Sequence, residues 1–344
     1  MFDHPAFDAH EGVHLFHDAM SGLRGMIAIH STHLGPAAGG CRMWNYTSGE
    51  EMLRDALRLS QGMSYKNAIA GLPLGGGKAV IWGDSRTEKT PDLFRAFGRS
   101  VDALGGKYWT AEDVGLSPAD LAHAAEETRY VAGLEQGDAA SGDPSPVTAR
   151  GVFRGILECA KRVFGSDDLT GRTVAVQGTG HVGGGVCQHL AQAGANLIVS
   201  DVNEETLMRV ARDTGARIVS PDEIYDQPAD IFSPNALGAI ISEATLARLS
   251  AKIIAGGANN QLVTPDLGRA LQKAGILYAP DYVINGGGII NVAAEISGNY
   301  SEDWVEDKLS ALMTSLGQIL DRSLSETRPT NEIADEIARA RIGR

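Results

Sequence analysis

"VAVQGTGHVGGGVCQHLAQAGANLIVSDVN", residues 174–203, places Gly178, Gly180 and Gly183 in G-x-G-x-x-G spacing between an apolar run and an amphipathic run. In a turn of this kind the first glycine allows a tight bend, the second lets a pyrophosphate approach the backbone, and the third lets helix and strand pack closely. The N-terminus of the following helix then binds the anion. The stretch predicts a βαβ unit that binds a dinucleotide; glycines placed for packing alone are the alternative.

Asp201 ends the second apolar run, eighteen residues after Gly183. A carboxylate in this place can accept hydrogen bonds from the ribose hydroxyls, and it repels a 2′-phosphate. The residues that follow, VNEE, offer no arginine to neutralise such a phosphate. We therefore predict NAD rather than NADP as the cofactor, with a solvated loop carboxylate as the alternative for Asp201.

Short apolar runs continue along this part of the chain and alternate with runs of helical length at 182–193, 204–213 and 265–273. Apolar strands separated by helices are typical of a parallel sheet that is covered on both faces. We therefore predict an α/β fold with a Rossmann-like, doubly wound domain. The expected strands are TVAVQ (173–177), NLIVS (196–200), ARIVS (216–220), DIFSP (230–234), KIIAG (252–256) and GILYA (275–279).

The chain of 344 residues is long for a single core, so two domains are expected. Residues 132–146, AGLEQGDAASGDPSP, are rich in Gly, Asp, Ser and Pro and lack an apolar period, so we place the domain boundary there. In the first domain, cap residues predict three helix starts: Ser48 with Glu51 as a capping box, Thr90 before Pro91, and Ser117 before Pro118.

The net charge of −13 disfavours nucleic acid and anionic membrane surfaces as principal partners. The first residues, MFDHPAFDAHEG, lack the basic and apolar regions of a signal peptide, and no apolar run is long enough to span a membrane. A cytoplasmic protein is therefore expected. The three cysteines are widely spaced, so we expect reduced thiols rather than a disulfide framework.

Lys78 follows three glycines in GLPLGGGKAV, residues 71–80. A Walker phosphate loop is excluded, because Leu72 and Ala79 occupy its glycine and Ser/Thr positions. Desolvation in such a stretch disfavours the ammonium form and lowers the pKa of a lysine toward that of a general base. Lys66, twelve residues earlier, can keep its charge and bind a carboxylate if both lysines enter one cleft. Ordinary surface lysines are the alternative for both.

These motifs together resemble the glutamate/leucine/phenylalanine/valine dehydrogenase family, and within it the leucine and phenylalanine dehydrogenase branch. The resemblance covers nearly the whole chain. It rests on LGPAAGGCRM (34–43), MSYKNAIAGLPLGGGKAVI (63–81), YWTAEDVG (108–115), DPSPVTARGV (143–152), VAVQGTGHVG (174–183), IAGGANNQL (254–262) and YAPDYVINGGGIINVAAE (278–295). It implies an oxidoreductase that deaminates an L-amino acid reversibly to its 2-oxo acid and ammonia, with hydride transfer from Cα to nicotinamide C4.

The resemblance also implies roles for individual residues. Lys78 would be the base that activates the water attacking the imine carbon, and Asp113 would exchange protons with the amino group. Lys66 would bind the substrate carboxylate together with the backbone of Gly39 and Gly40, and Met63 and Asn260 would also contact the substrate. The cofactor would be bound by Thr148 near the nicotinamide, by Gly178, Thr179, Gly180, His181, Val182 and Gly183 in the turn, and by Asp201, Val202, Asn235, Ala236 and Asn259.

Ala38, Ala111, Ile289 and Val292 match family positions that line the pocket for the substrate side chain. An uncharged apolar lining leaves the second carboxylate of glutamate unpaired and suits aliphatic or aromatic side chains. We favour leucine, valine or isoleucine. Ala38 enlarges the pocket relative to the usual leucine, so a phenylalanine dehydrogenase is the alternative. A non-catalytic NAD-binding sensor is the alternative from a different class, and the presence of Lys66, Lys78 and Asp113 favours the enzyme.

The family fold implies an N-terminal α/β substrate-binding and oligomerisation domain formed by 1–135 with 325–344, and an NAD-binding domain formed by 136–324. DAASGDPSP, residues 138–146, would be the hinge between them. A homo-oligomer, at least a dimer, is expected. Six of the nine histidines lie within the first thirty-three residues, but no cysteine or acidic ligand pattern accompanies them. We expect scattered surface histidines and no metal.

Overall fold

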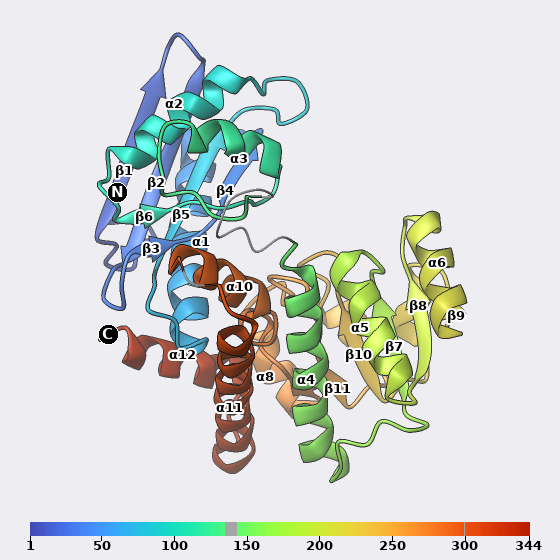
Figure 1. Cartoon of the computed structure of the whole chain (residues 1–344). Helices are drawn as coiled ribbons and strands as arrows, with labels where there is room; N and C mark the ends of the chain where they lie inside the picture. The colour runs from blue at the N-terminus through green and yellow to red at the C-terminus, as the bar shows by residue number, and fades with distance from the viewer. Residues whose placement is uncertain (135–142, 299) are drawn as a thin grey trace. The chain divides into compact units, whose positions relative to one another are not determined.

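The computed structural model describes residues 1–134, 143–298 and 300–344 (Figure 1). The chain forms two compact units. Unit 1 comprises Met1–Asp143, Ile289–Val305 and Ala338–Arg344, and unit 2 comprises Pro144–Gly288 and Glu306–Ile337. The sequence-based division instead assigned 325–344 to the first domain. Most of the expected hinge at 138–146 lies outside the described residues.

Unit 1 contains a mixed six-stranded sheet in the order β1-β2-β5-β3-β6, with β4 paired to β5. The pairs β1/β2 and β2/β5 are antiparallel, and β5 runs parallel to both β3 and β4. The strands are β1 Gly12–Asp18, β2 Leu23–Ser31, β3 Ala37–Ala38, β4 Cys41–Trp44, β5 Gly75–Trp82 and β6 Tyr108–Trp109.

The two faces of this sheet are covered by different helices. Met52 and Ala56 of α1, Gly49–Ile69, form a buried cluster with Val80 of β5. A second cluster contains Phe94 and Phe97 of α2 (Pro91–Asp102) together with residues of α3 (Pro118–Ala125). It also includes Ala79 and Ile81, which alternate with Lys78 and Val80 along β5. Because side chains alternate across a strand, Lys78 shares the face of Val80, which is the face toward α1.

Unit 2 contains a sheet of six parallel strands in the order β12-β11-β10-β7-β8-β9. Numbered from β7, this is the order 3-2-1-4-5-6 of a doubly wound dinucleotide-binding fold. The predicted α/β class is therefore confirmed. The strands are β7 Thr173–Gln177, β8 Asn196–Ser200, β9 Arg217–Ile218, β10 Ile231–Pro234, β11 Ile253–Ile254 and β12 Leu277–Tyr278.

Helices precede, connect and follow the strands of unit 2 along the chain. These are α4 Ser145–Phe164, α5 His181–Gln192, α6 Glu204–Thr214, the 3₁₀ helix η1 Glu223–Asp226, α7 Glu243–Leu246, α8 Leu267–Lys273, α9 Asp281–Ile284, α10 Gly287–Ile296, α11 Glu302–Glu326 and α12 Thr330–Arg341. The residues of α10 from Ile289 and of α12 from Ala338 belong to unit 1. Among the described residues, no helix has the length and apolar character needed to cross a membrane.

The last residues of the chain pack against the start of unit 1. Arg344 donates hydrogen bonds to the carbonyls of Asp8, Ala9 and His30, with N···O distances of 2.6, 2.8 and 2.9 Å. Arg341 donates to the carbonyls of Ala68 and Ile69 at the end of α1. Segments far apart in the sequence therefore complete the same unit.

Candidate active site

Lys78 and Asp113 form a buried ion pair in unit 1. Lys78 projects from β5 and is 5% exposed, and its Nζ lies 2.5 Å from Oδ2 of Asp113. Asp113 follows Glu112, which forms a bridge to Cys41 at the start of β4. Because β4 pairs with β5 and also bridges to Glu112, Lys78 and Asp113 come together although they are 35 residues apart in the sequence.

Asp113 is held in its ionised form. Burial acts to raise the pKa of its carboxyl, but Lys78 and Arg42 outweigh this effect and lower the pKa to about 2. The pair therefore offers a carboxylate that can accept a proton next to an amine that can donate one.

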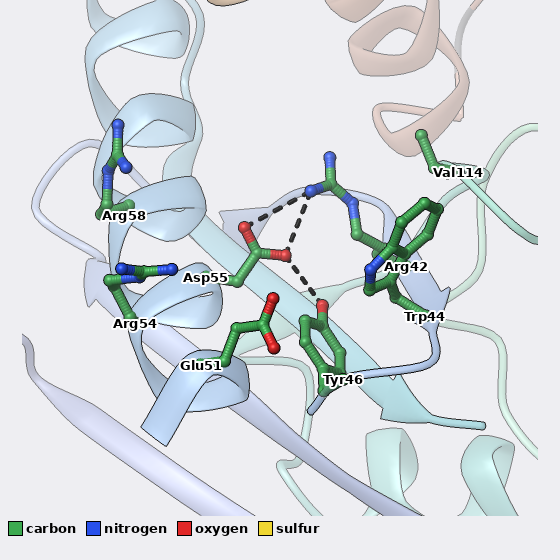
Figure 2. A pocket seen from close by; sticks show the side chains of 8 residues that line it. All are labelled: Arg42, Trp44, Tyr46, Glu51, Arg54, Asp55, Arg58 and Val114. Carbon is green, nitrogen blue, oxygen red and sulfur yellow. Dashed lines mark hydrogen bonds and ion pairs between the residues drawn. The ribbon is translucent and has the colours of Figure 1, made fainter. Parts of the chain in front are cut away.

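Arg42 and Asp55 extend this charged group. Arg42 Nε lies 3.2 Å from Oδ2 of Asp113, and its Nη1 lies 3.1 Å from Oδ2 of Asp55. The hydroxyl of Tyr46 donates to the same oxygen of Asp55 at 2.7 Å. Figure 2 shows these side chains in a cavity of about 320 Å³, lined by Arg42, Trp44, Tyr46, Glu51, Arg54, Asp55, Arg58 and Val114. No motif in the sequence indicated a role for Arg42, Asp55 or Tyr46.

Gly39 and Gly40 lie beside this group, and close packing explains why both are glycines. A Cβ on Gly39 would lie 1.9 Å from the carbonyl oxygen of Gly77 and 3.0 Å from Cγ of Met63. A Cβ on Gly40 would lie 2.9 Å from Cβ of Asp113. The structure thus brings Gly39, Gly40 and Met63 into the neighbourhood of the ion pair.

Lys66 lies in the last turn of α1, whose end is fixed against β5. A Cβ on Gly76 would lie 2.0 Å from the backbone nitrogen of Ser64, and Nδ2 of Asn67 donates to the carbonyl of Gly75 at 2.6 Å. Lys66, flanked by these two contacts, is half-buried. Whether it shares a cleft with Lys78 stays a prediction.

The predicted pocket residues lie on three segments of unit 1. Ala38 in β3 pairs with Gly76 of β5 and with Trp109 of β6. Ala111 follows β6 and accepts a hydrogen bond from the backbone of Cys41 at 2.8 Å. Ile289 and Val292 are half-buried and three residues apart on α10, so they share one face of that helix.

The glycine turn of unit 2 has the geometry that an anion-binding loop needs. Gly178 has a φ of +95°, and a Cβ on Gly183 would lie 2.0 Å from the carbonyl oxygen of Gly178. Gly180 precedes His181 and Val182 as the N-cap of α5, and no side chain of the described residues caps this helix. A Cβ on Gly180 would meet nothing within 4 Å, so the backbone amides at the start of α5 have room for a phosphate group.

Asp201 holds the turn by hydrogen bonds. Its Oδ2 accepts from the backbone and the hydroxyl of Thr179 at 2.5 and 3.1 Å, and its Oδ1 accepts from the backbone of Asn203 at 2.8 Å. Partial burial acts to raise its pKa, but the hydrogen bonds from Asn203 and Thr179 lower it. Val202 beside it is 87% exposed. A carboxylate oxygen has more than one lone pair, so these contacts leave acceptor capacity for a ribose hydroxyl.

Asn235 and Ala236 border the same turn. A Cβ on Gly178 would lie 2.7 Å from the backbone nitrogen of Ala236, and Oδ1 of Asn235 accepts from the backbone of Gly257 at 2.8 Å. Asn285 continues the network, because its Nδ2 donates to Oδ1 of Asn259 at 2.7 Å and to the carbonyl of Gly257 at 3.1 Å. Asn259 is thereby connected to the turn.

Asn260 and Thr148 lie at other positions in unit 2. Asn260 has a φ of +51°, a left-handed conformation that asparagine tolerates better than most residues. Thr148 lies in the first turn of α4 and donates its hydroxyl to the carbonyl of Pro144 at 3.0 Å. A Cβ on Gly288 would lie 3.0 Å from Oγ1 of Thr148, so Gly288 leaves space beside this hydroxyl.

The expectation of scattered surface histidines is wrong for His10 and His30. Their exposed fractions are 8% and 0%, and their ring centroids lie 4.8 Å apart. Their nitrogens find buried partners, since His10 Nε2 lies 3.0 Å from the carbonyl of Leu57 and His30 Nδ1 lies 2.7 Å from the hydroxyl of Ser64. In the described part of the chain, no group of three His, Cys, Asp or Glu side chains is arranged to hold a metal.

Comparison with known proteins identifies both parts of the chain. Residues 10–130 match the family model described as "Glu/Leu/Phe/Val dehydrogenase, dimerisation domain", and residues 199–332 match "Glutamate/Leucine/Phenylalanine/Valine dehydrogenase". The matched regions contain Lys66, Lys78 and Asp113 in the first case and Asp201 and Asn260 in the second.

Individual relatives match over nearly their whole length. A leucine dehydrogenase of Bacillus subtilis is 50% identical over 327 residues, which cover 95% of this chain and 90% of the relative. A phenylalanine dehydrogenase of Bacillus thermotolerans is 44% identical over 338 residues, covering 97% and 88%. The crystal structure of L-tryptophan dehydrogenase from Nostoc punctiforme has a TM-score of 0.86 at 43% identity, covering 97% and 96%. The chain therefore belongs to the glutamate/leucine/phenylalanine/valine dehydrogenase family of amino acid dehydrogenases.

Proposed function

We propose that this chain catalyses the reversible, NAD-dependent oxidative deamination of leucine, valine or isoleucine to the 2-oxo acid and ammonia. The observation that carries the proposal is the buried ion pair between Lys78 and Asp113. Imine formation and hydrolysis need one group that takes a proton from the substrate amine and another that takes a proton from water. A close amine–carboxylate pair supplies both groups.

In this proposal Asp113 takes a proton from the substrate ammonium, which leaves the amino group neutral. Bound NAD supplies the hydride acceptor for the substrate Cα. Once Asp113 is protonated, Lys78 loses its counter-charge and can release its own proton to solvent. Lys78 can then take a proton from the water that attacks the imine carbon, and Asp113 can return its proton to the amino nitrogen of the carbinolamine. As the C–N bond breaks, the remaining hydroxyl proton of the carbinolamine passes to the departing ammonia, which leaves as ammonium.

Substrate recognition is assigned to residues of unit 1. Lys66 would bind the carboxylate with the backbone of Gly39 and Gly40, and Met63 would also contact the substrate. The family resemblance separately assigns a substrate contact to Asn260. Ala38, Ala111, Ile289 and Val292 would line the side-chain pocket. The uncharged lining supports an apolar substrate, since a buried carboxylate without a partner is costly.

Cofactor binding is assigned to unit 2. The pyrophosphate would lie on the amides of Thr179 to Gly183 at the start of α5, and Asp201 with Val202 would contact the adenosine ribose. Thr148 would lie near the nicotinamide, and Asn235, Ala236 and Asn259 would also bind the cofactor. The carboxylate of Asp201 supports NAD over NADP, because it repels a 2′-phosphate.

Cellular location and oligomeric state are also part of the proposed function. We propose that the protein is cytoplasmic. We also propose a homo-oligomer, at least a dimer, and the match of residues 10–130 to a dimerisation domain supports the oligomer. We also propose that the N-terminal part carries the oligomer contacts.

The test is an absorbance assay for NADH with leucine, valine, isoleucine, phenylalanine, tryptophan and glutamate, each with NAD and with NADP. We expect turnover with the branched-chain substrates and NAD, and none with glutamate. Preference for phenylalanine or tryptophan would assign the chain to the aromatic branch. This is the second candidate, because Ala38 is expected to enlarge the pocket and because the chain is similar to a phenylalanine dehydrogenase and to an L-tryptophan dehydrogenase. Silence with every substrate, together with intact NAD binding by calorimetry, would contradict the proposal and favour a sensor.

A further inference from the structure

We infer that Arg42, held by Asp55 and Tyr46, is a positioning residue for Asp113. The inference rests on the proposed function, because it concerns how Asp113 is kept ready to exchange protons. Its basis is the unbroken series of contacts from Tyr46 through Asp55 and Arg42 to Asp113. Each of these four side chains lies in unit 1, and three of them line the cavity in Figure 2.

Regular secondary structure fixes Arg42, Lys78 and Asp55 in this arrangement, while Tyr46 and Asp113 lie outside helices and strands. Arg42 in β4 pairs in register with Val80 in β5, two residues after Lys78. Arg42 and Lys78 therefore leave the sheet on the face covered by α1, which carries Asp55. A group held by two strands and a helix keeps its geometry better than one held by loops.

Arg42 and Lys78 bind the same oxygen of Asp113. Nε of Arg42 lies 3.2 Å and Nζ of Lys78 lies 2.5 Å from Oδ2. Two donors from different strands restrict rotation of the carboxylate. The planar guanidinium can make this contact and the Asp55 contact at once, because its N–H groups point in fixed directions.

Arg42 also supplies a charge that Lys78 cannot hold throughout the reaction. In the proposed function Lys78 gives up a proton during turnover, whereas an arginine side chain stays protonated. Arg42 therefore keeps a cation beside Asp113 at every stage, and Asp55 offsets its charge. The Cys41 thiol and the Tyr108 phenol also interact electrostatically with Asp113, and both stay neutral because burial raises their pKa values.

The test compares Arg42→Gln and Arg42→Lys with the wild-type enzyme and with Arg54→Gln. Arg54 lines the same cavity but forms no ion pair with Asp113 in the described structure, so it is the matched control. Arg42→Gln should lower kcat at least ~10-fold and leave the KM for NAD unchanged. Its acidic limb of kcat should move by about one pH unit toward higher pH, since loss of the Arg42 charge lets the Lys78–Asp113 pair bind a proton more readily. Arg42→Lys should restore part of kcat, and Arg54→Gln should match the wild type.

Two further variants test the groups behind Arg42 without removing its charge. Asp55→Asn and Tyr46→Phe should lower kcat several-fold, by about 3- to 10-fold, because Arg42 is held less firmly. Neither should move the acidic limb upward, since the cation stays beside Asp113. An upward shift in Asp55→Asn equal to that of Arg42→Gln would contradict the assigned roles.

Several outcomes would overturn the inference while leaving the proposed function intact. One is that Arg42→Gln keeps the wild-type kcat or leaves the acidic limb unmoved. Another is that Arg42→Lys does not restore any of the kcat lost in Arg42→Gln, and a third is that Arg54→Gln loses as much kcat as Arg42→Gln. Failure of the wild-type enzyme to oxidise any amino acid would instead contradict the proposed function. Thermal unfolding and NAD binding of each variant identify those that are misfolded. If the Arg42 variants are misfolded, the kcat values and pH profiles of Tyr46→Phe and Asp55→Asn decide whether Arg42 positions Asp113.

Discussion

Burial makes either partner of the Lys78–Asp113 pair difficult to remove without a measurable effect. Asp113 keeps a side-chain exposure of 24%, against 6% for Lys78, so the carboxylate is the more accessible partner. Loss of one partner leaves the other charge buried and uncompensated. A substitution here is therefore expected to affect both catalysis and stability, and an experiment must measure both.

Lys78→Ala should lower kcat by about 10²- to 10⁴-fold, the range usual for loss of a general base. NAD binding, measured by calorimetry, should be retained because Lys78 lies in unit 1. Lys89→Ala is the matched control, since Lys89 forms an ion pair of 2.6 Å with Asp120 in the same unit. Equal losses of activity in the two variants would mean that Lys78 acts only through stability.

Asp201→Asn should relax the discrimination between the two nicotinamide cofactors. The amide keeps the size of the side chain and an oxygen that can accept from Thr179, but it no longer repels a 2′-phosphate. The ratio of kcat/KM for NAD to that for NADP should fall by about 10-fold or more. An unchanged ratio would show that Asp201 serves only to hold the turn.

Local spacing is the reason why some residues of the site could be predicted from the sequence. Gly178, Gly180 and Gly183 lie within one turn, and Lys78 follows directly on three glycines. Arg42, by contrast, contacts Asp55 and Asp113, which are 13 and 71 residues away. No periodicity relates such positions, so only the packing of α1 and of the segment after β6 against β4 identifies them as partners.

At the scale of elements, Gly183 couples the start of α5 to the end of β7. Gly183→Ala should raise the KM for NAD at least ~10-fold, because its Cβ would lie 2.0 Å from the carbonyl oxygen of Gly178 and would displace the helix. The KM for leucine should stay within about two-fold of the wild type. In the neighbouring control Gly184→Ala, the nearest atom to the Cβ is 3.3 Å away, so the helix should tolerate it. Equal effects of both substitutions would contradict this role for Gly183.

The strands of unit 2 were predictable because each is a continuous apolar run between helices. All six expected runs contain an observed strand, although β9, β11 and β12 keep only two residues of each run. The helix caps Ser48, Thr90 and Ser117 were also confirmed. At Ser48 the reciprocal half of the box differs, since the Glu51 carboxylate accepts from Thr47. The mixed sheet of unit 1 was not predictable, because β3 and β6 have two residues each and are defined only by their neighbours.

At the scale of the whole molecule, His30 links the stability of unit 1 to pH. Its ring accepts a hydrogen bond from Arg344 at 2.8 Å through Nε2, which requires the neutral form. Burial, followed by the charges of Arg344 and His10, lowers the pKa of His30 from 6.5 to about 4. The unfolded chain therefore binds more protons between these two pH values, so stability is complete above pH 6.5 and is lost as the pH falls toward 4.

The free energy of unfolding should decrease by about 3 kcal/mol between pH 7 and pH 4 through this residue alone. Urea unfolding at a series of pH values measures it. His30→Gln should flatten the slope in this range, whereas His33→Gln, at an exposed position three residues later, should leave it unchanged. A slope that persists in His30→Gln would assign the pH dependence to other groups.

The return of the chain to unit 1 has a consequence for protein synthesis. A nascent chain that has emerged only to residue 143 lacks the segments Ile289–Val305 and Ala338–Arg344, which belong to the same unit. The carbonyls of Ala68 and Ile69 then lack their Arg341 donor, and His30 lacks Arg344. Domains usually fold in the order in which they leave the ribosome. Here the part made first is completed last, so a translation stall late in the message should leave an N-terminal unit that proteases and chaperones recognise as unfinished.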